Sequence, residues 1–304
     1  MSNINSTISI PNTNLTRIAL GALVCGAFAI GFAPIFVRLS EVGPGATAFW
    51  RILLALPVLW LWMAVEGQNT TAPRQPTRPA DYRWLAAAGL FFAGDIAVWH
   101  WSLQFTFVAN ATLLVNFAPI FVTLGAWLLW KQRINWIFLL GLAVALAGAV
   151  MLIGASFQLS AQNLLGDVLS LLAAVSYGGY ILTVKQLRNH FSVATIMAWG
   201  GLFSCAAVFL AALLAGEQFI ALSLQGWVVL IALALLSHVG GQGLIAYALA
   251  HLPAPFSSVT LLLQPVISTF LAWLILNEAL GGWQAFGGII VLVGIWLARR
   301  GSKV

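Results

Sequence analysis

An acidic residue lies inside a long apolar stretch of this chain. Asp95 stands within the sequence AGLFFAGDIAVWHW at residues 88–101. A carboxylate at the centre of a membrane helix costs roughly 2.5–3.5 kcal/mol, so such residues usually face a bundle interior or a wet cavity. Trp99 follows four residues later on the same helical face. An anion beside an apolar ring suits an ammonium group, although the same carboxylate can instead carry a proton or join two helices by hydrogen bonds.

Histidine occurs in two further apolar stretches. His100 follows Trp99 but points about 100° around the helix, so it either titrates near neutral pH and passes a proton or simply packs. His238 and Gln242 stand four residues apart in SHVGGQGLIAY, residues 237–247. Glycines around them allow another helix or a ligand to come close. The pair therefore either lines a cavity or joins a tight helix crossing.

Two prolines occur inside apolar stretches, each preceded by an amide side chain a few positions earlier. Asn116 stands before Pro119 and Gln264 directly before Pro265. A proline inside a helix frees the carbonyl four residues earlier and weakens that turn, so we interpret Pro119 and Pro265 as hinges. Nearby hydroxyls such as that of Thr123, or water in a cavity, can satisfy the freed carbonyls. Asn116 and Gln264 either face a cavity or bridge helices.

Aromatic residues supply further candidates. Tyr177 and Tyr180 occur in SYGGYILTV at residues 176–184, beside two glycines where the backbone can be approached. Their rings can stack on a bound molecule or form the wall of a cavity. The candidate binding or cavity residues are therefore Asp95, Trp99, His100, Asn116, Tyr177, Tyr180, His238, Gln242 and Gln264.

Composition shows what must position these side chains. Of 304 residues, 62% are hydrophobic and only 7% are charged, whereas soluble chains average about 25% charged residues. The sequence therefore predicts an integral membrane protein. A membrane helix needs about 20 mostly apolar residues. Ten stretches qualify, near residues 18–38, 46–65, 84–103, 109–130, 135–154, 165–185, 193–215, 226–249, 255–276 and 282–298.

The basic residues predict orientation, because cytoplasmic loops retain Lys and Arg. With the N-terminus in the cytoplasm, all but two of the 13 Lys and Arg residues fall on the cytoplasmic side. The exceptions, Arg38 and Arg51, flank the first external loop, and we place Arg51 near the outer edge of its span. The basic residues form no dense patch, so we expect the lipid bilayer, and no nucleic acid, as partner. Both termini are expected to be cytoplasmic.

The second half of the chain repeats the first. Residues 112–129 align without gaps on 258–275, which places Pro119 on Pro265. The same offset of 146 residues places the glycine pair at 141 and 148 on the pair at 287 and 294, which predicts a helix-packing seam. Five spans per copy put the second copy in the opposite orientation. Inverted repeats are the ground plan of many secondary transporters and predict alternating access.

These patterns define the expected fold and domains. The fold class is an all-α integral membrane protein with ten transmembrane helices in two inverted five-helix repeats. We expect a cytoplasmic tail at 1–16, a first repeat at 17–154, an external connection at 155–162, a second repeat at 163–299 and a cytoplasmic tail at 300–304.

Three motifs also carry a family likeness. Ala-Phe-Trp-Arg at 48–51, Ala-Asn-Ala-Thr-Leu-Leu through Pro at 109–119, and Ser-Ser-Val-Thr-Leu-Leu-Leu-Gln-Pro through Leu-Asn-Glu at 257–278 occur in this order. The chain resembles the drug/metabolite transporter superfamily, EamA type. That resemblance implies a central cavity between the repeats and export of amino acids or related metabolites, as by the YddG-like aromatic amino-acid exporters. The glutamate after the fourth helix of the family matches Glu278 in the second copy but Gln132 in the first.

Other classes fit the sequence less well. The four histidines share no ligand spacing and no nucleophile–base motif is present, so we expect no metal, no cofactor and no enzyme. A channel would need a filter motif or a ring of like charges. An organic-cation or drug exporter remains an alternative. A nucleotide-sugar carrier is a weaker one, because its phosphates should meet cations and Arg51 is placed at the edge.

We therefore expect a secondary transporter of small metabolites, above all amino acids, in the bacterial inner membrane. Export is implied by the resemblance alone. A monomer is expected, and a dimer is left open.

Overall fold

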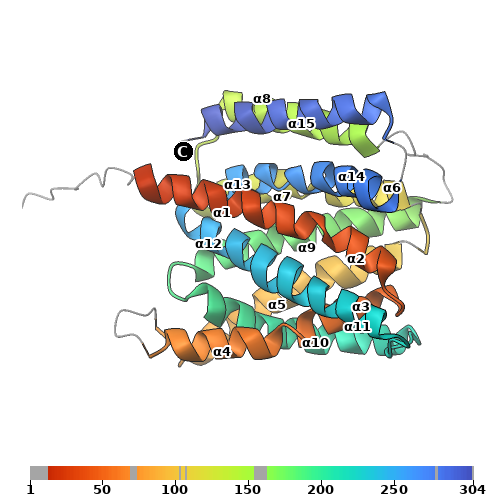
Figure 1. Ribbon diagram of the computed structural model, residues 1–304. Coiled ribbons are helices and arrows are strands. Elements are labelled where there is room, and N and C mark those ends of the chain that lie inside the picture. The colour runs from red at the N-terminus through yellow and green to blue at the C-terminus, as the bar shows by residue number, and fades with distance from the viewer. Residues whose placement is uncertain are drawn as a thin grey trace, which may run out of the picture.

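The computed structural model describes residues 13–68, 74–102, 104–106, 108–153, 163–277 and 280–302. Glu278 and the whole expected connection at 155–162 lie outside the described residues. The described elements are helices that run nearly parallel as one bundle (Figure 1). The predicted all-α membrane fold is therefore confirmed.

In the first repeat, the spans are built from α1 (Thr13–Gly31) with α2 (Ala33–Leu39), α3 (Pro44–Leu53) with α4 (Leu56–Glu66), α5 (Pro79–Ser102), α6 (Val108–Val115) with α7 (Ala118–Trp130), and α8 (Trp136–Ile153). In the second repeat they are built from α9 (Leu164–Leu187), α10 (Val193–Leu214), α11 (Leu224–Ala232) with η3 (Leu233–Gln242) and α12 (Gly243–His251), α13 (Ala254–Thr260) with α14 (Leu263–Leu276), and α15 (Gly282–Gly301).

The number of membrane helices agrees closely with the expectation. Nine helical stretches of the described chain are long and apolar enough to cross a bilayer. The helix outside this set is α5, which corresponds to the third predicted span and carries Asp81, Arg83 and Asp95. Because α5 packs along both α9 and α10 within the bundle, it is the tenth span.

Both predicted hinge prolines stand at real interruptions. α6 ends at Val115 and α7 begins at Ala118, while α13 ends at Thr260 and α14 begins at Leu263. Pro119 and Pro265 each lie in the first turn after the break, where a missing N–H costs no hydrogen bond.

The expectation for the freed carbonyls was wrong in detail. The carbonyl of Leu261 accepts the backbone N–H of Gln264 at 2.9 Å, so a tight turn satisfies it. The hydroxyl of Thr123 donates to the carbonyl of Pro119 at 2.6 Å and not to that of Val115. These spans therefore break cleanly into two helices, because the turn supplies its own hydrogen bonds.

Contacts between the two repeats occur in matching pairs. α7 packs on α9 as α14 packs on α1, and α5 packs on α9 as η3 and α12 pack on α1. α8 and α15 lie side by side at one edge of the bundle (Figure 1). A β-carbon at Gly287 would lie only 2.7 Å from the backbone nitrogen of Leu152, so glycine allows this close approach. The predicted glycine seam thus joins α8 to α15.

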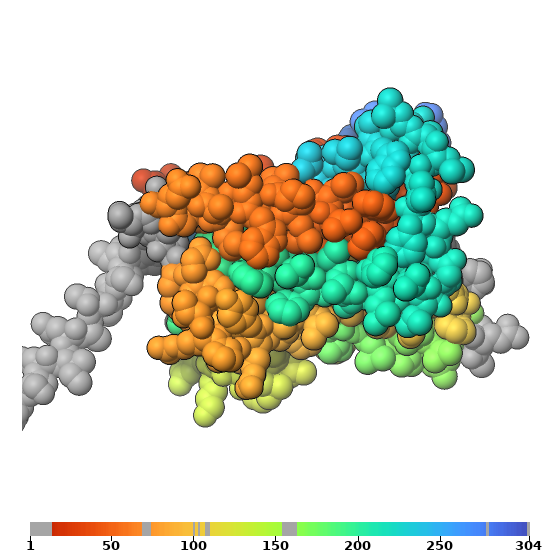
Figure 2. Space-filling view, turned by 90° about the horizontal axis from the view of Figure 1, so that it is seen from below, coloured from red at the N-terminus to blue at the C-terminus, as the bar shows by residue number. Residues whose placement is uncertain are grey.

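The outer surface of the bundle is apolar. Figure 2 shows one such face, where the 44–66 segment lies beside α10 and α5. Large apolar side chains such as Leu61, Leu210 and Leu213 are exposed on these helices. In water this surface would be unfavourable, but it suits contact with lipid tails.

The two ends of the bundle are joined differently. The first residues of α1 and the last of α15 lie at the same end (Figure 1). At the opposite end, residues 41–50 of the first repeat bond residues 217–223 of the second. We call this set the repeat clamp.

Four side-chain contacts make up the core of the repeat clamp. Glu217 accepts the backbone N–H of Ala46 at 2.8 Å, and Trp50 Nε1 donates to the carbonyl of Phe219 at 2.6 Å. Glu41 accepts the backbone N–H groups of Leu222 and Ser223 at 2.9 and 3.0 Å. The hydroxyl of Ser223, which also donates to Glu41, and these two backbone N–H groups hold the pKa of Glu41 below its usual value. At the end of the bundle away from the repeat clamp, the guanidinium of Arg74 stacks 4.7 Å from the ring of Phe191. At the same end, the hydroxyl of Thr195 donates a hydrogen bond to the side chain of Gln75.

Candidate functional site

A cluster of aromatic and polar side chains lies in the middle of the bundle, around Phe92 of α5. The ring of Phe92 lies 5.0 Å from that of Tyr180 on α9 and 5.5 Å from that of His238 on η3. The guanidinium of Arg51 on α3 lies 6.0 Å from the same ring, within the range of a cation–π contact. Phe92 thus connects helices of both repeats.

Two tyrosines extend the cluster along α9. Their rings are stacked, with centroids 6.2 Å apart and planes inclined by 19°. The hydroxyl of Tyr177 interacts with the side chain of Gln264, which stands in the first turn after the α13–α14 break. Tyr180 and His238 are buried, whereas Tyr177 and Gln264 are half-buried. The cluster therefore reaches the point where the second repeat is interrupted.

Asp95 and Arg51 bring opposite charges into the same region. They interact electrostatically with each other and with the tyrosines. In the described part of the chain, neither a hydrogen bond nor an ion pair links the two side chains, and the recorded Arg–Asp ion pair is a different one, Arg74 with Asp81. Both side chains are half-buried, and Arg51 Nε is itself buried without a hydrogen-bond partner in the described chain.

The placement of Arg51 corrects the sequence interpretation. It stands in the last turn of α3 and points to Phe92, not to the outer edge of the membrane. The signal was present, because an arginine in the apolar stretch AFWRILL is costly unless it faces the bundle interior. Its proximity to a loop led us to assign it to the surface.

Several buried polar atoms here have no hydrogen-bond partner within the described chain. They are Arg51 Nε, His238 Nδ1, Gln242 Oε1 and Gln264 Nε2. Leaving a buried polar group unsatisfied costs about 1–3 kcal/mol. Four such atoms in the core of one bundle indicate a place that water or a ligand fills.

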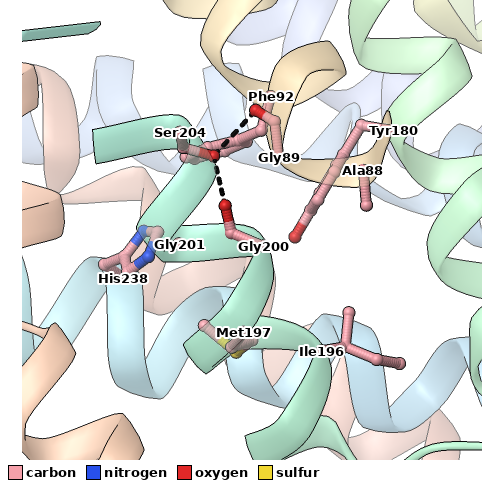
Figure 3. Close-up of a pocket in the computed structure, with 10 residues that line it drawn as sticks. All are labelled: Ala88, Gly89, Phe92, Tyr180, Ile196, Met197, Gly200, Gly201, Ser204 and His238. Carbon is pink, nitrogen blue, oxygen red and sulfur yellow. Dashed lines mark hydrogen bonds between the residues drawn. The ribbon is translucent and has the colours of Figure 1, made fainter. Parts of the chain in front are cut away.

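The cavity in this conformation is small. Figure 3 shows His238 and Tyr180 approaching it from opposite sides, while Ser204 donates to the backbone carbonyls of Gly89 and Gly200. Its volume of about 20 Å³ fits one water molecule. Small-molecule sites usually measure about 300–1,000 Å³. A metabolite could occupy this particular cavity only if the helices around it moved apart.

An uncommon helix type carries two of the candidates. Residues 233–242 form a π-helix, in which each N–H bonds five residues back. His238 and Gln242 lie on it, both only 4% exposed. Such π-segments are rare and frequently occur at functional sites. The sequence predicted the two side chains but not the widened helix that carries them.

The other predicted residues lie less centrally. Asn116 donates its amide N–H to the carbonyl of Thr112 at 2.7 Å. Its hydrogen bond therefore stays within its own span, beside the break between α6 and α7. Trp99 is half-buried one turn beyond Asp95. His100 belongs to α5, but its side chain lies outside what the structure describes.

Comparison with known proteins agrees with this architecture. The model of the EamA-like transporter family matches the chain twice, over residues 17–154 and 164–300. The chain belongs to the EamA-like transporter family. It is therefore a multi-pass membrane transporter and not an enzyme.

Individual EamA relatives cover almost the whole chain. An uncharacterised transporter of Archaeoglobus fulgidus is 27% identical over 91% of this chain and 94% of its own length. A probable amino-acid metabolite efflux pump of Salmonella typhimurium is 26% identical over 94% and 95%. A probable terminal-alkyne amino-acid exporter of Streptantibioticus cattleyicolor is 28% identical over 90% of both chains. A solved crystal structure shares the fold, with a TM-score of 0.77 at 19% identity over 96% and 99% of the two chains.

Proposed function

We propose that this EamA transporter exports amino acids or closely related metabolites across the bacterial inner membrane. The observation that carries the proposal is the group of unpartnered polar atoms around Phe92, where both repeats meet. Relatives named as amino-acid metabolite and amino-acid exporters support the substrate class and the direction.

Asp95 is proposed to bind the substrate ammonium group. Its carboxylate is half-buried, stands about one turn beyond Phe92 on α5 and has no hydrogen bond within the described chain. Tyr177 and Tyr180 offer ring faces for an apolar side chain, and Trp99 extends this surface along α5. His238, Gln242 and Gln264 offer hydrogen-bonding atoms that nothing in the described chain uses. His100 and Asn116 stay candidates for proton coupling and for helix bending.

Alternating access between inverted repeats is proposed as the mechanism. The cavity beside Phe92, Tyr180 and His238 holds only one water, so a metabolite would use that space only after the helices separate. The repeat clamp closes one end, whereas the contacts of Arg74 and Gln75 close the other. Separation at one end at a time would expose the Phe92 cluster to one side of the membrane and then to the other.

The distribution of charge supports a cytoplasmic location for both termini. Arg299 and Arg300 stand at the end of α15, where the chain returns to the end at which it began. Glu41 and Glu217 lie in the repeat clamp at the opposite end. By the positive-inside tendency, the repeat clamp faces the cell exterior.

The test is counterflow of labelled amino acids into proteoliposomes that contain the purified protein, with and without a pH gradient. Saturable flux of at least one amino acid is expected, and Asp95→Asn should lower it at least about tenfold because a buried charged hydrogen bond is worth roughly 1.5–3 kcal/mol. Arg38→Gln, at an exposed arginine at the end of α2, is the matched control. Absence of saturable flux for every amino acid would contradict the proposal.

An organic-cation exporter is the second candidate, because Asp95 alone would suit a cation. The nearby guanidinium of Arg51 opposes a purely cationic substrate. Arg51 is an interior cation, so the lack of such a cation does not exclude a nucleotide-sugar carrier. The carboxylate of Asp95 disfavours that class, since it repels phosphates.

A further inference from the structure

Arg51 is the charged residue of the central cluster that has no assigned role. Its guanidinium lies over the ring of Phe92 and beside the tyrosines of α9, and its Nε is buried without a hydrogen-bond partner in the described chain. An arginine in a membrane interior is costly and usually pairs with an acid or a ligand. The nearby acid, Asp95, does not bond it directly. The guanidinium therefore retains donors for a bound molecule.

The positions of the second repeat that are equivalent to Arg51 and Asp95 carry no charge. The offset of 146 residues places Met197 opposite Arg51 and Gly241 opposite Asp95. Met197 lines the small cavity (Figure 3), and Gly241 packs against Ile30 of α1. The second repeat thus offers an apolar wall where the first offers an acid and a base. The alternation of conformations between the two repeats does not need residues that occur in one repeat only. Such residues can therefore determine which substrate binds.

We infer that Arg51 binds the carboxylate of the substrate while Asp95 binds its ammonium group, so that the site selects zwitterionic α-amino acids. The inference rests on the proposed function and defines its substrate class. Arg51 lies over Phe92, and Asp95 stands about one turn beyond Phe92 on the same helix, yet no hydrogen bond joins the two charged side chains in the described chain. Two half-buried charges that do not pair are a costly arrangement in a bundle interior. A zwitterion brings one group of each sign and satisfies both. An amine leaves Arg51 unpaired, and a carboxylic acid leaves Asp95 unpaired.

The surroundings favour an amino acid with an apolar or aromatic side chain. Phe92, Tyr177 and Tyr180 offer ring surface next to the charges. A guanidinium can bind a carboxylate through two parallel N–H groups, which gives the site directional preference as well as charge. Lysine at this position would keep the charge but lose the paired geometry.

Binding to the purified protein in detergent tests the inference separately from transport. The probes are two matched series: L-phenylalanine, phenethylamine and 3-phenylpropionate, and L-leucine, isoamylamine and 4-methylpentanoate. The wild type should bind the better amino acid about tenfold to hundredfold more tightly than either of its analogues, as expected for losing a charged hydrogen bond. Tryptophan fluorescence or a thermal shift gives the dissociation constants.

The variants should give a crossed pattern that misfolding cannot imitate. Arg51→Gln should abolish the preference for the amino acid over the amine but keep the preference over the acid. Asp95→Asn should do the reverse, and Arg51→Lys should retain part of the lost preference. Arg38→Gln should behave as wild type.

Each outcome separates the two ideas. If the wild type binds the amino acid and the amine equally, the inference fails although amino-acid transport can stand. If it shows the crossed pattern but no flux in proteoliposomes, the inference stands and the transport proposal fails. If neither amino acid binds, the inference is overturned, and the counterflow panel decides the transport proposal separately.

Discussion

Asp81 shows how a single carboxylate fastens a membrane helix at its entry. Both carboxylate oxygens accept N–H groups of Arg74 at 2.7 Å. The same side chain accepts the backbone N–H groups of Thr77 and Arg78, the two residues just before α5. Arg74 in turn stacks on Phe191 of the second repeat. Asp81 therefore organises the end of the bundle opposite the repeat clamp.

Replacing Asp81 should destabilise the protein in a pH-dependent manner. The Arg74 guanidinium and the two backbone donors hold the pKa of Asp81 well below its usual range. A lowered pKa stabilises the folded state above the unfolded value of about 3.9, and this stabilisation is lost as the pH falls toward the folded value. Asp81→Asn should lower the melting temperature by a few degrees at pH 7, and the difference from wild type should shrink below pH 4. Thermal unfolding in detergent micelles, with Arg83→Gln as control, measures this. A difference that widens on acidification would contradict it.

Sequence reasoning at this scale found one member of the charged pair and missed the other. Asp95 was predicted because it lies far from any loop. Arg51 was not, because a long cationic side chain near a helix end usually extends to the membrane surface. Its direction is set by the docking of α3 on α10, a tertiary contact that periodicity does not contain. Phe92, the centre of the cluster, looked like any apolar residue of a span.

Helix breaks are the main feature at the scale of elements. Four spans are interrupted, and each break precedes a proline: Pro34, Pro57, Pro119 and Pro265. The last two occupy equivalent places in the repeats, which the sequence alone showed. The turns themselves could not be foreseen, because whether a proline bends a helix or divides it depends on local hydrogen bonds such as that from Gln264 to Leu261.

Removing the paired prolines should slow transport more than it weakens binding. In the double variant Pro119→Ala/Pro265→Ala, the two spans can form continuous helices. Bending of these spans between conformations then becomes harder. The counterflow rate should fall several-fold, while the substrate dissociation constant changes little. Pro79→Ala, at the exposed first residue of α5 and at no break within a span, should keep the wild-type rate. An unchanged rate in the double variant would show that these breaks are static.

The π-helix marks the limit of prediction from sequence patterns. Residues 233–242 have the apolar composition of an ordinary span. Nothing in the spacing of their side chains shows whether each N–H bonds the carbonyl five residues back or four residues back. Packing of η3 against α1, α3 and α11 accompanies the widened turns. His238 and Gln242 were identified from residue type, but their helix geometry had to come from the structure.

For the whole molecule, the repeat clamp should decide which side of the membrane the cluster can reach. Glu217→Ala removes the acceptor for the N–H of Ala46 and frees space beside Gly43 and Gly45. The clamp end should then open more often. A cysteine in place of Gln264, in a background with Cys25→Ser and Cys205→Ala, should react several-fold faster with an impermeant thiol reagent added outside cells.

Gln218→Ala provides the control for this experiment. Its side chain is exposed in the same loop, so the labelling rate should equal that of the unmodified clamp. Equal labelling in the Glu217→Ala protein would show that the acid does not hold the end closed. Faster labelling from the cytoplasmic side alone would reverse the proposed orientation.

The close contact between α8 and α15 also affects how the protein is made. Gly148 lies on α8 in the middle of the chain, whereas the glycines that face α8, Gly287 and Gly294, lie on the last helix, so α8 enters the membrane long before α15 exists. Gly294 follows Gly148 by 146 residues, which at synthesis rates of about 5–20 residues per second is a wait of roughly 7–30 s. During that time the glycine face of α8 is open to the α15 of another, nearly finished copy, and exchanged pairs can form. Several ribosomes that translate one messenger RNA close together would favour such exchange. Whether α15, the last helix to be synthesised, pairs with α8 of its own chain decides whether the protein forms as a monomer.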